Sequence, residues 1–352
     1  MDTGRRTCVI CPGPDNPRNS EGSFAVLADG RIRFIFSRYR GDSGADDAYA
    51  DIAEIISCDG GETWTEPRIL FRASDIHAKN IMSVTLLRLN NGDLGLFYIV
   101  KEFGVNDWIA MHRSSDDGET WSEARRCFVH EGYFVLNNDR VIRLSTGRLV
   151  MPLGLHPAGG MRHYGIRSDA VDIFYLSDDD GESWRASKSV VAYENPYNPA
   201  GLQEPGVIEL SNGVIWGYAR TSLGRQYEFF SMDGGDTWTQ AQPSRFTSPC
   251  SPLKIARSPF DGRLLAVWNP APPYPTRAYD WGHMDRTPLV YALSDGGMDF
   301  GEPQIIEAEP QHGYCYPAVC FLDAHTVLLS YCAGGIEDKG ILNRTAIRKL
   351  RI

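Results

Sequence analysis

The stretch Ser57–Trp64, SCDGGETW, decides the fold because near-copies of it return along the chain. The copies read SSDDGETW from residue 114, SDDDGESW from 177 and SMDGGDTW from 231, with a degraded SDGGMDF from 294. Their last aromatic residues are spaced 54 to 63 residues apart. A period of this length is typical of an array of similar supersecondary units, so the repeat is interpreted before any single copy.

Each unit has the same order of apolar segments. A hairpin comes first, as in VTLLRLNNGDLGLFYIV (84–100), where NNGD supplies the tight turn. A third apolar run and then the acidic turn follow, and no segment shows sustained helical periodicity with caps. The pattern predicts an all-β fold: a six-bladed β-propeller of four-stranded antiparallel blades, forming one domain over residues 1–352. The N-terminal TCVICPG (7–13) is expected to pair into the last blade and close the ring.

Composition and charge limit the classes of function. The chain of 352 residues is 42% hydrophobic and 23% charged, as in ordinary globular proteins, and its net charge of -10 argues against nucleic acid or an anionic membrane as partner. No apolar run approaches the roughly 20 residues that span a bilayer, and the start lacks the apolar core of a secretory signal, so we expect a cytoplasmic protein. One CxxC pair, Cys8 and Cys11, is interpreted as packed thiols and not as a metal site. The oligomeric state is left open.

The repeated acidic turns are interpreted as structural. Their Asp can accept hydrogen bonds from turn amides, their Gly allows a positive φ, and their Trp can cover the adjoining blade. Every copy follows a third strand, so all copies lie around one end of the propeller and cannot converge on one substrate or metal ion. The functional face is therefore expected at the opposite end, where the long loops 37–51 and 268–288 lie.

Counting from the hairpin turns selects residues at that opposite face. Nine residues before the turn position lie Glu204 and Tyr316, and the corresponding strand starts in the first three blades are near Glu21, Ser83 and Asn138. Second and third strands and their loops add Arg38, Arg220, Arg286 and the pair Asp46–Asp47. Several arginines and carboxylates with a tyrosine on one face predict a binding or catalytic site.

These features resemble the sialidase (neuraminidase) superfamily over nearly the whole chain. The segment QEPGVIELSNGVIWGYAR (203–220) resembles the family segment in which a Glu precedes one strand and an Arg ends the next, and Arg286 stands eight residues before an acidic-turn serine, as a second family arginine does. The segment GYCYPAVCFLDAHTVLLSY (313–331) resembles the nucleophile strand.

The resemblance implies a retaining exo-glycosidase that acts on a glycan with a terminal acidic sugar and needs no cofactor. Tyr316 would be the nucleophile, with Tyr314 as the alternative, and Glu204 its base. Asp46 or Asp47 would be the acid and base at the leaving oxygen. Arg220 and Arg286 would hold the substrate carboxylate.

One family motif is missing. Sialidases have Arg-Ile-Pro before the first hairpin, where this chain has RNSEGSFAVLADG (18–30). Glu21 lies near the place of the missing arginine, and Arg18 and Arg38 are the candidates to replace it. Two other functions stay open: a hydrolase or lyase acting on a uronic-acid or neutral sugar, for which His156 and His283 would matter, and a non-catalytic carbohydrate-binding propeller.

Overall fold

The computed structural model describes residues 4–102, 107–157, 169–270 and 286–352. Within these residues the regular structure is strand, apart from two short 3-10 helices, η1 (Ala73–Ile76) and η2 (Ile336–Asp338). Neither the helices nor any other described segment forms a helix long and apolar enough to cross a membrane. The molecule is therefore an all-β protein, as its repeats predict.

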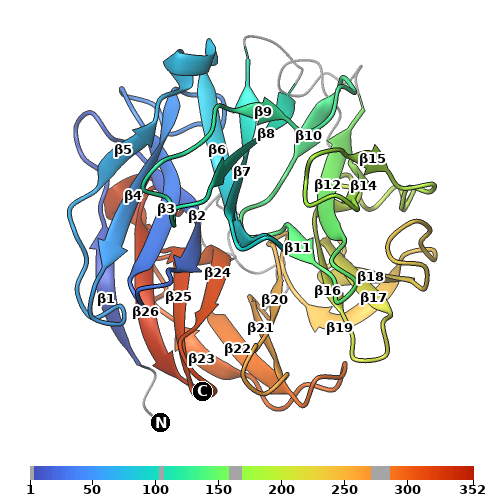
Figure 1. The fold of residues 1–352 in the computed structure, drawn as a ribbon. Coiled ribbons are helices and arrows are strands. Elements are labelled where there is room, and N and C mark those ends of the chain that lie inside the picture. The colour runs from blue at the N-terminus through green and yellow to red at the C-terminus, as the bar shows by residue number, and fades with distance from the viewer. Residues whose placement is uncertain (1–3, 103–106, 158–168, 271–285) are drawn as a thin grey trace.

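The strands form antiparallel sheets arranged in a ring, which is a β-propeller (Figure 1). The first sheet has eight strands, and a single parallel bridge between Ala50 and Asn80 joins its run β2-β3-β4-β5 to its run β6-β7-β8-β9. Its strands are β2 (Asn19–Val26), β3 (Ile32–Tyr39), β4 (Ala50–Ser57), β5 (Arg68–Phe71), β6 (Asn80–Arg88), β7 (Leu94–Lys101), β8 (Asp107–Ser114) and β9 (Arg125–Arg126).

Three further sheets follow in chain order. In the second and third, neighbouring strands are consecutive in sequence, whereas in the first both β10 and β11 pair with β12. The first contains β10 (Tyr133–Val135), β11 (Ile142–Arg143), β12 (Leu149–His156), β14 (Val171–Ser177) and β15 (Arg185–Ala186). The second contains β16 (Gln203–Glu209), β17 (Ile215–Arg220), β18 (Arg225–Ser231) and β19 (Gln242–Thr247). The third contains β20 (Lys254–Arg257), β21 (Leu264–Trp268), β22 (Leu289–Ser294) and β23 (Gln304–Glu307).

The last sheet brings the two ends of the chain together. It has the order β1-β26-β25-β24, with β1 (Arg5–Ile10) paired antiparallel to β26 (Thr345–Arg351). The other two strands of this sheet are β24 (Cys315–Phe321) and β25 (Thr326–Cys332). Figure 1 shows the blue N-terminal strand beside the red C-terminal strand. A strand from the start of the chain thus covers the edge that the last strand would otherwise expose.

The acidic turns use their carboxylates on their own backbone. In the first turn, Asp59 Oδ1 accepts from the Thr63 amide at 2.9 Å and Asp59 Oδ2 accepts from the Thr63 hydroxyl at 2.6 Å. The same pair of bonds recurs in the three later full copies, at Asp116, Asp179 and Asp233. Trp64 packs against a core cluster that contains Phe34 and Leu328, from β3 and β25. The turns therefore close the third strand of each unit and seal the contact with the preceding sheet.

Candidate active site

Four innermost strands share one backbone irregularity, and it lies at residues selected by counting from the turns. Glu21, Ser83, Glu204 and Tyr316 have φ values of 56°, 59°, 51° and 55°, and the pairing with the next strand shifts register at each of them. A β-bulge of this kind breaks the alternation of a strand and redirects a side chain. The left-handed conformation costs a non-glycine residue about 1–2 kcal/mol, and such strain concentrates at functional sites.

The bulges bring side chains of different sheets into contact. Tyr316 Oη donates to Glu204 Oε1 at 2.8 Å, and both residues are buried, with 8% of each exposed. Arg220 Nη1 lies 2.9 Å from Glu204 Oε2 and 3.4 Å from Tyr316 Oη. Gln203 accepts from Arg220 Nε and Nη2, which fixes the guanidinium. A phenol, a carboxylate and a guanidinium thus form one buried hydrogen-bonded group.

The phenol of Tyr316 does not ionise on its own near neutral pH. Burial raises its pKa well above 10, the charge of Glu204 raises it further, and Arg220 and Arg286 act in the opposite direction. The proton of Tyr316 Oη therefore leaves only if a group in contact accepts it. Glu204 Oε1 is in that position, which is the arrangement of a nucleophile and its general base.

Arg286 approaches Tyr316 from another sheet. Its guanidinium carbon lies 5.5 Å from the centroid of the Tyr316 ring, and its Nη2 donates to the Cys250 carbonyl at 3.1 Å. The side chain of Cys315 is a further contact. Among the described residues no carboxylate forms an ion pair with Arg286. Most of its donor fork is available to an anionic ligand in front of Tyr316.

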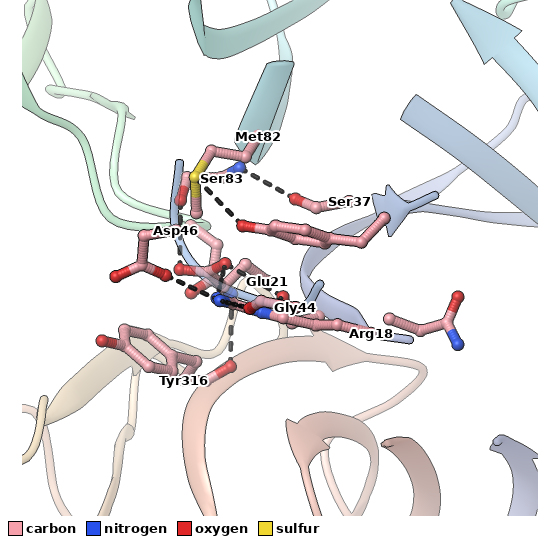
Figure 2. Close-up of polar contacts among 12 residues, drawn as sticks. Arg18, Glu21, Ser37, Gly44, Asp46, Met82, Ser83 and Tyr316 are labelled. Carbon is pink, nitrogen blue, oxygen red and sulfur yellow. Dashed lines mark hydrogen bonds and ion pairs between the residues drawn. The ribbon is translucent and has the colours of Figure 1, made fainter. Parts of the chain in front are cut away.

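Arg18 fills the space beside Glu21 that the missing Arg-Ile-Pro motif leaves open. The side chain is 1% exposed, and Figure 2 shows its contacts converging on the guanidinium. Nη2 donates to Glu21 Oε2 at 2.8 Å, and Nη1 donates to Asp46 Oδ1 at 2.6 Å and to the Gly44 carbonyl at 3.1 Å. Nε donates to Ser20 Oγ at 2.9 Å. Four of the five N–H groups of a guanidinium are thus used within the protein.

Asp46, and not Asp47, faces this cluster. Its side chain is 66% exposed, yet surrounding protein still affects it: burial raises its pKa, and the charges of Arg18 and Lys101 overcome that effect and lower it to about 2. Arg220 also lowers the pKa of Asp46, so the carboxylate shares one space with the Tyr316 group. Asp47 instead lies 3.5 Å from Lys79 Nζ.

Lys101 is a neighbour of the site that the sequence analysis missed. Its Nζ donates to Tyr133 Oη at 3.1 Å, and 8% of the residue is exposed. His156, one of the histidines considered for other chemistry, packs edge-on against Tyr133 with ring centroids 5.6 Å apart. A single lysine at the end of an apolar strand belongs to no motif, so the sequence alone does not indicate that it lies at the site.

Arg38 and Tyr314, like Asp47, do not join the cluster. Successive side chains of a β-strand point to opposite faces. The Ser37 side chain is on the cluster side of β3, where its Oγ accepts from the Ser83 amide at 2.9 Å. Arg38 therefore points to the other side of β3, where it lines a separate groove. Tyr314 is fully buried, with its ring stacked on His312 and edge-on to that of Tyr331. The left-handed backbone at Tyr316 directs its side chain to the cluster, whereas the Tyr314 side chain stays in the core.

Asn138 is structural in position. Its amide donates to the carbonyls of Gly22 at 2.8 Å and Tyr316 at 3.2 Å, which links three sheets across the ring. The positive φ in this unit falls on Asp139, one residue later, because its innermost strand is split into β10 and β11. Asp139 forms an ion pair with Lys254 at 2.7 Å, and both were missed by the sequence analysis.

Part of the predicted face lies outside the described residues. His283 and most of the loop 268–288 fall within 271–285 and are not placed. In the described ranges, no group of three or more His, Cys, Asp or Glu side chains is arranged to hold a metal ion. The ionisable side chains of the described cluster are arginines, carboxylates and one tyrosine, with Lys101 as a neighbour.

Comparisons with known proteins agree with this fold. A sialidase of Paraclostridium sordellii is 24% identical over 353 residues, which cover 91% of this chain and 82% of the relative. A Hadza microbial sialidase has a similar structure, with a TM-score of 0.72, 18% identity and 95% of this chain and 66% of that one covered. A Dyadobacter fermentans protein of unknown function matches over 100% of both chains with a TM-score of 0.71 and 17% identity.

Family membership rests on the repeat itself. A model of the BNR repeat-like domain matches residues 34–327, which is more than half of the chain and includes the acidic turns. The chain therefore belongs to the BNR repeat-like domain family, among the propellers of the sialidase superfamily.

Proposed function

We propose that the protein is a sialidase-like exo-glycosidase that removes a terminal acidic sugar from a glycan. The observation that carries this proposal is the 2.8 Å hydrogen bond from Tyr316 Oη to Glu204 Oε1, beside two arginines. Both residues adopt a strained left-handed conformation. A protein that only binds sugars gains nothing from a strained phenol held against a buried carboxylate.

The mechanism that fits this geometry is retaining. Tyr316 Oη attacks the anomeric carbon while its proton passes to Glu204, and Asp46 gives a proton to the leaving oxygen. The glycosyl–tyrosine bond is then broken by a water whose proton Asp46 takes, and Glu204 returns a proton to Tyr316. A neutral phenol avoids the repulsion that a carboxylate nucleophile would meet at a sugar that carries its own carboxylate.

Substrate recognition is assigned to two arginines. Arg286 has most of its donors available, and Arg220 adds a guanidinium held by Gln203 and Glu204. Arg18 directs its donors to Glu21, Asp46 and their neighbours, so it positions the acid more than it grips a substrate. This division favours an acidic sugar and leaves a sialic acid and a uronic acid as the two candidates.

The scaffold we propose for this site is a single six-bladed domain. Its support is the division of the first sheet at the bridge Ala50–Asn80 into two four-stranded runs. With the three middle sheets and the sheet closed by β1, this gives six antiparallel units around one axis. Units that converge on one axis explain how residues 18, 204, 220 and 316 meet.

A hydrolysis screen tests the proposal. Fluorogenic aryl glycosides of sialic acids, uronic acids and neutral sugars are offered to the full chain, and NMR identifies the anomer released first. We expect turnover of an acidic glycoside with retention, its loss in Tyr316→Phe, and little change in the matched control Tyr314→Phe. An unsaturated product that absorbs in the ultraviolet would assign a lyase, and unaltered retention of glycans without turnover would assign a binding protein.

A further inference from the structure

A second cavity lies away from the proposed active site, and we call it the β1 groove. It has a volume of about 620 Å³ and runs between the N-terminal segment 7–16 and the segment 64–67 that follows the first acidic turn. Arg38 lies on its wall, with Asn16 beside it. Tyr316, Glu204, Arg220 and Arg286 do not line it. The groove is thus a separate feature of the surface, between β1 and the first sheet.

Arg38 is a half-buried cation without a counter-charge. Its partner across the ladder is Asp51, but one Asp51 oxygen accepts from the Ala73 amide and the other faces Arg40 and Arg72, at 3.4 and 3.8 Å. No carboxylate of the described chain lies within ion-pair distance of Arg38. Burial lowers the pKa of its guanidinium, and no neighbouring acid offsets this effect.

An unpaired cation in such a position costs free energy unless a ligand supplies the opposite charge. The protein as a whole is negative, with a net charge of -10, so an arginine without a carboxylate partner on the wall of this groove is unusual. Two acids, Asp15 and Glu66, also line the groove, and neither lies within ion-pair distance of Arg38. The charge of Glu66 acts on Cys8, where it is the second cause, after burial, that raises the pKa of the thiol to about 11.

The remaining wall suits a sugar ring. Trp64 offers a partly buried indole whose Nε1 donates to Thr7 Oγ1 at 3.3 Å, and Pro14 and Pro67 add apolar surface. Next to Arg38, the amide of Asn16 approaches Nη1 to 3.3 Å when its oxygen is turned toward the guanidinium. Apolar side chains set among polar groups in this way are found in small-molecule sites.

We propose that the β1 groove is a second ligand site, which binds the carboxylate of an acidic saccharide through Arg38. The planar fork of a guanidinium matches the two oxygens of a carboxylate. An oxyanion such as phosphate shares this chemistry but lacks the ring that would lie on Trp64. The site is independent of catalysis, so it stands or fails without regard to the proposed activity of the cleft.

A cysteine in the groove provides a local readout. Cys11 is exposed and lines the groove, whereas Cys58 is exposed and does not, so Cys58 is an internal control. The full chain is alkylated with iodoacetamide in the presence of N-acetylneuraminic acid, glucuronic acid or inorganic phosphate, and peptide mass spectrometry follows both thiols. At three times its Kd a ligand leaves about a quarter of the sites free, so the alkylation rate of Cys11 falls about fourfold while that of Cys58 is unchanged.

Variants separate this site from the cleft. We expect Arg38→Met to remove the protection of Cys11 and Arg286→Met to leave it intact. Arg38→Lys keeps the positive charge but lacks the two-pronged guanidinium, and it replaces Arg38→Met in the experiment if that variant does not fold. We expect Arg38→Lys to weaken the protection of Cys11. The proposal is overturned if neither sugar acid protects Cys11, if phosphate protects as well as both do, if protection survives in Arg38→Met, or if it disappears in Arg286→Met.

Discussion

Removing the Arg18–Glu21 pair is expected to raise the pKa of Asp46 and to move the pH dependence of turnover. Arg18→Met alone would leave the Glu21 carboxylate, which is 6% exposed, without its partner, and breaking one side of a buried pair costs about 3–5 kcal/mol. The double variant Arg18→Met/Glu21→Gln removes both charges. The amide keeps the contacts with Ser20 and Ser83.

The size of the effect follows from the position of Asp46. Its pKa is held at about 2 against a usual 3.8, and Arg18 is the largest influence that lowers it, with Lys101 remaining in the double variant. Burial acts in the other direction, so loss of Arg18 lets the pKa rise toward 3.8. Near pH 6 the protonated fraction of Asp46 would then grow by up to about 60-fold.

The assay is kcat/KM against pH with the glycoside found in the screen. If Asp46 gives the proton to the leaving oxygen, the alkaline side of the profile reports its pKa in the free enzyme. Normalising each profile to its own maximum removes any loss of substrate binding. We expect the midpoint to move to higher pH in the double variant and not in Glu21→Gln. An unchanged midpoint would refute control of Asp46 by Arg18, and a wild-type profile in Asp46→Asn would remove Asp46 from the mechanism.

Three further predictions concern the base, the turns and the ring centre. Glu204→Gln should lower kcat about 10²–10⁴-fold in steady-state assays, because no other contact of the phenol among the described residues accepts a proton. Hydrogen bonds from Thr120 lower the pKa of Asp116 to about 2. The ionised carboxylate therefore stabilises the fold above about pH 4, and this stabilisation is lost as the pH falls toward 2. In Asp116→Asn the melting temperature should fall less over this pH range. Asn138→Ala leaves two buried carbonyls without their donor, and urea unfolding should show a loss of about 1–3 kcal/mol.

The scaffold could be predicted because its repeats fix distances along the chain. A turn nine residues after the strand start located Glu21, Glu204 and Tyr316, since the number of residues from the left-handed position to the hairpin turn is the same in those units. The count was one residue out at Asn138, where the innermost strand is interrupted and Asp139 takes the left-handed conformation. A repeat thus predicts positions well only where each unit keeps the regular pairing.

The sequence could not predict which arginine contacts Glu21. The answer depends on which face of β3 the Arg38 side chain points to and on the path of the loop that contacts Arg18. Arg38 follows Ser37, whose side chain faces the cluster, so it points to the opposite side of β3. Arg18 precedes its strand, and only the folded path of the loop that carries Gly44 and Asp46 shows what it contacts. Lys101 and Lys254 carried no motif at all, and only the fold brings them to the cluster and to the ring centre.

The strain at the four bulges explains why both ends of the propeller matter to the site. Each left-handed residue costs about 1–2 kcal/mol, and the structure around it must hold that conformation. At the site end, the bond from Asn138 to the Tyr316 carbonyl fixes the backbone at the strained residue itself. At the far end, hydrogen bonds inside each acidic turn close the turn, and Trp64 of the first turn packs on the core between the first and the last sheet. A protein of this design can keep its turns while its site residues change, so its substrate has to be determined from Arg220 and Arg286 and not from the repeat.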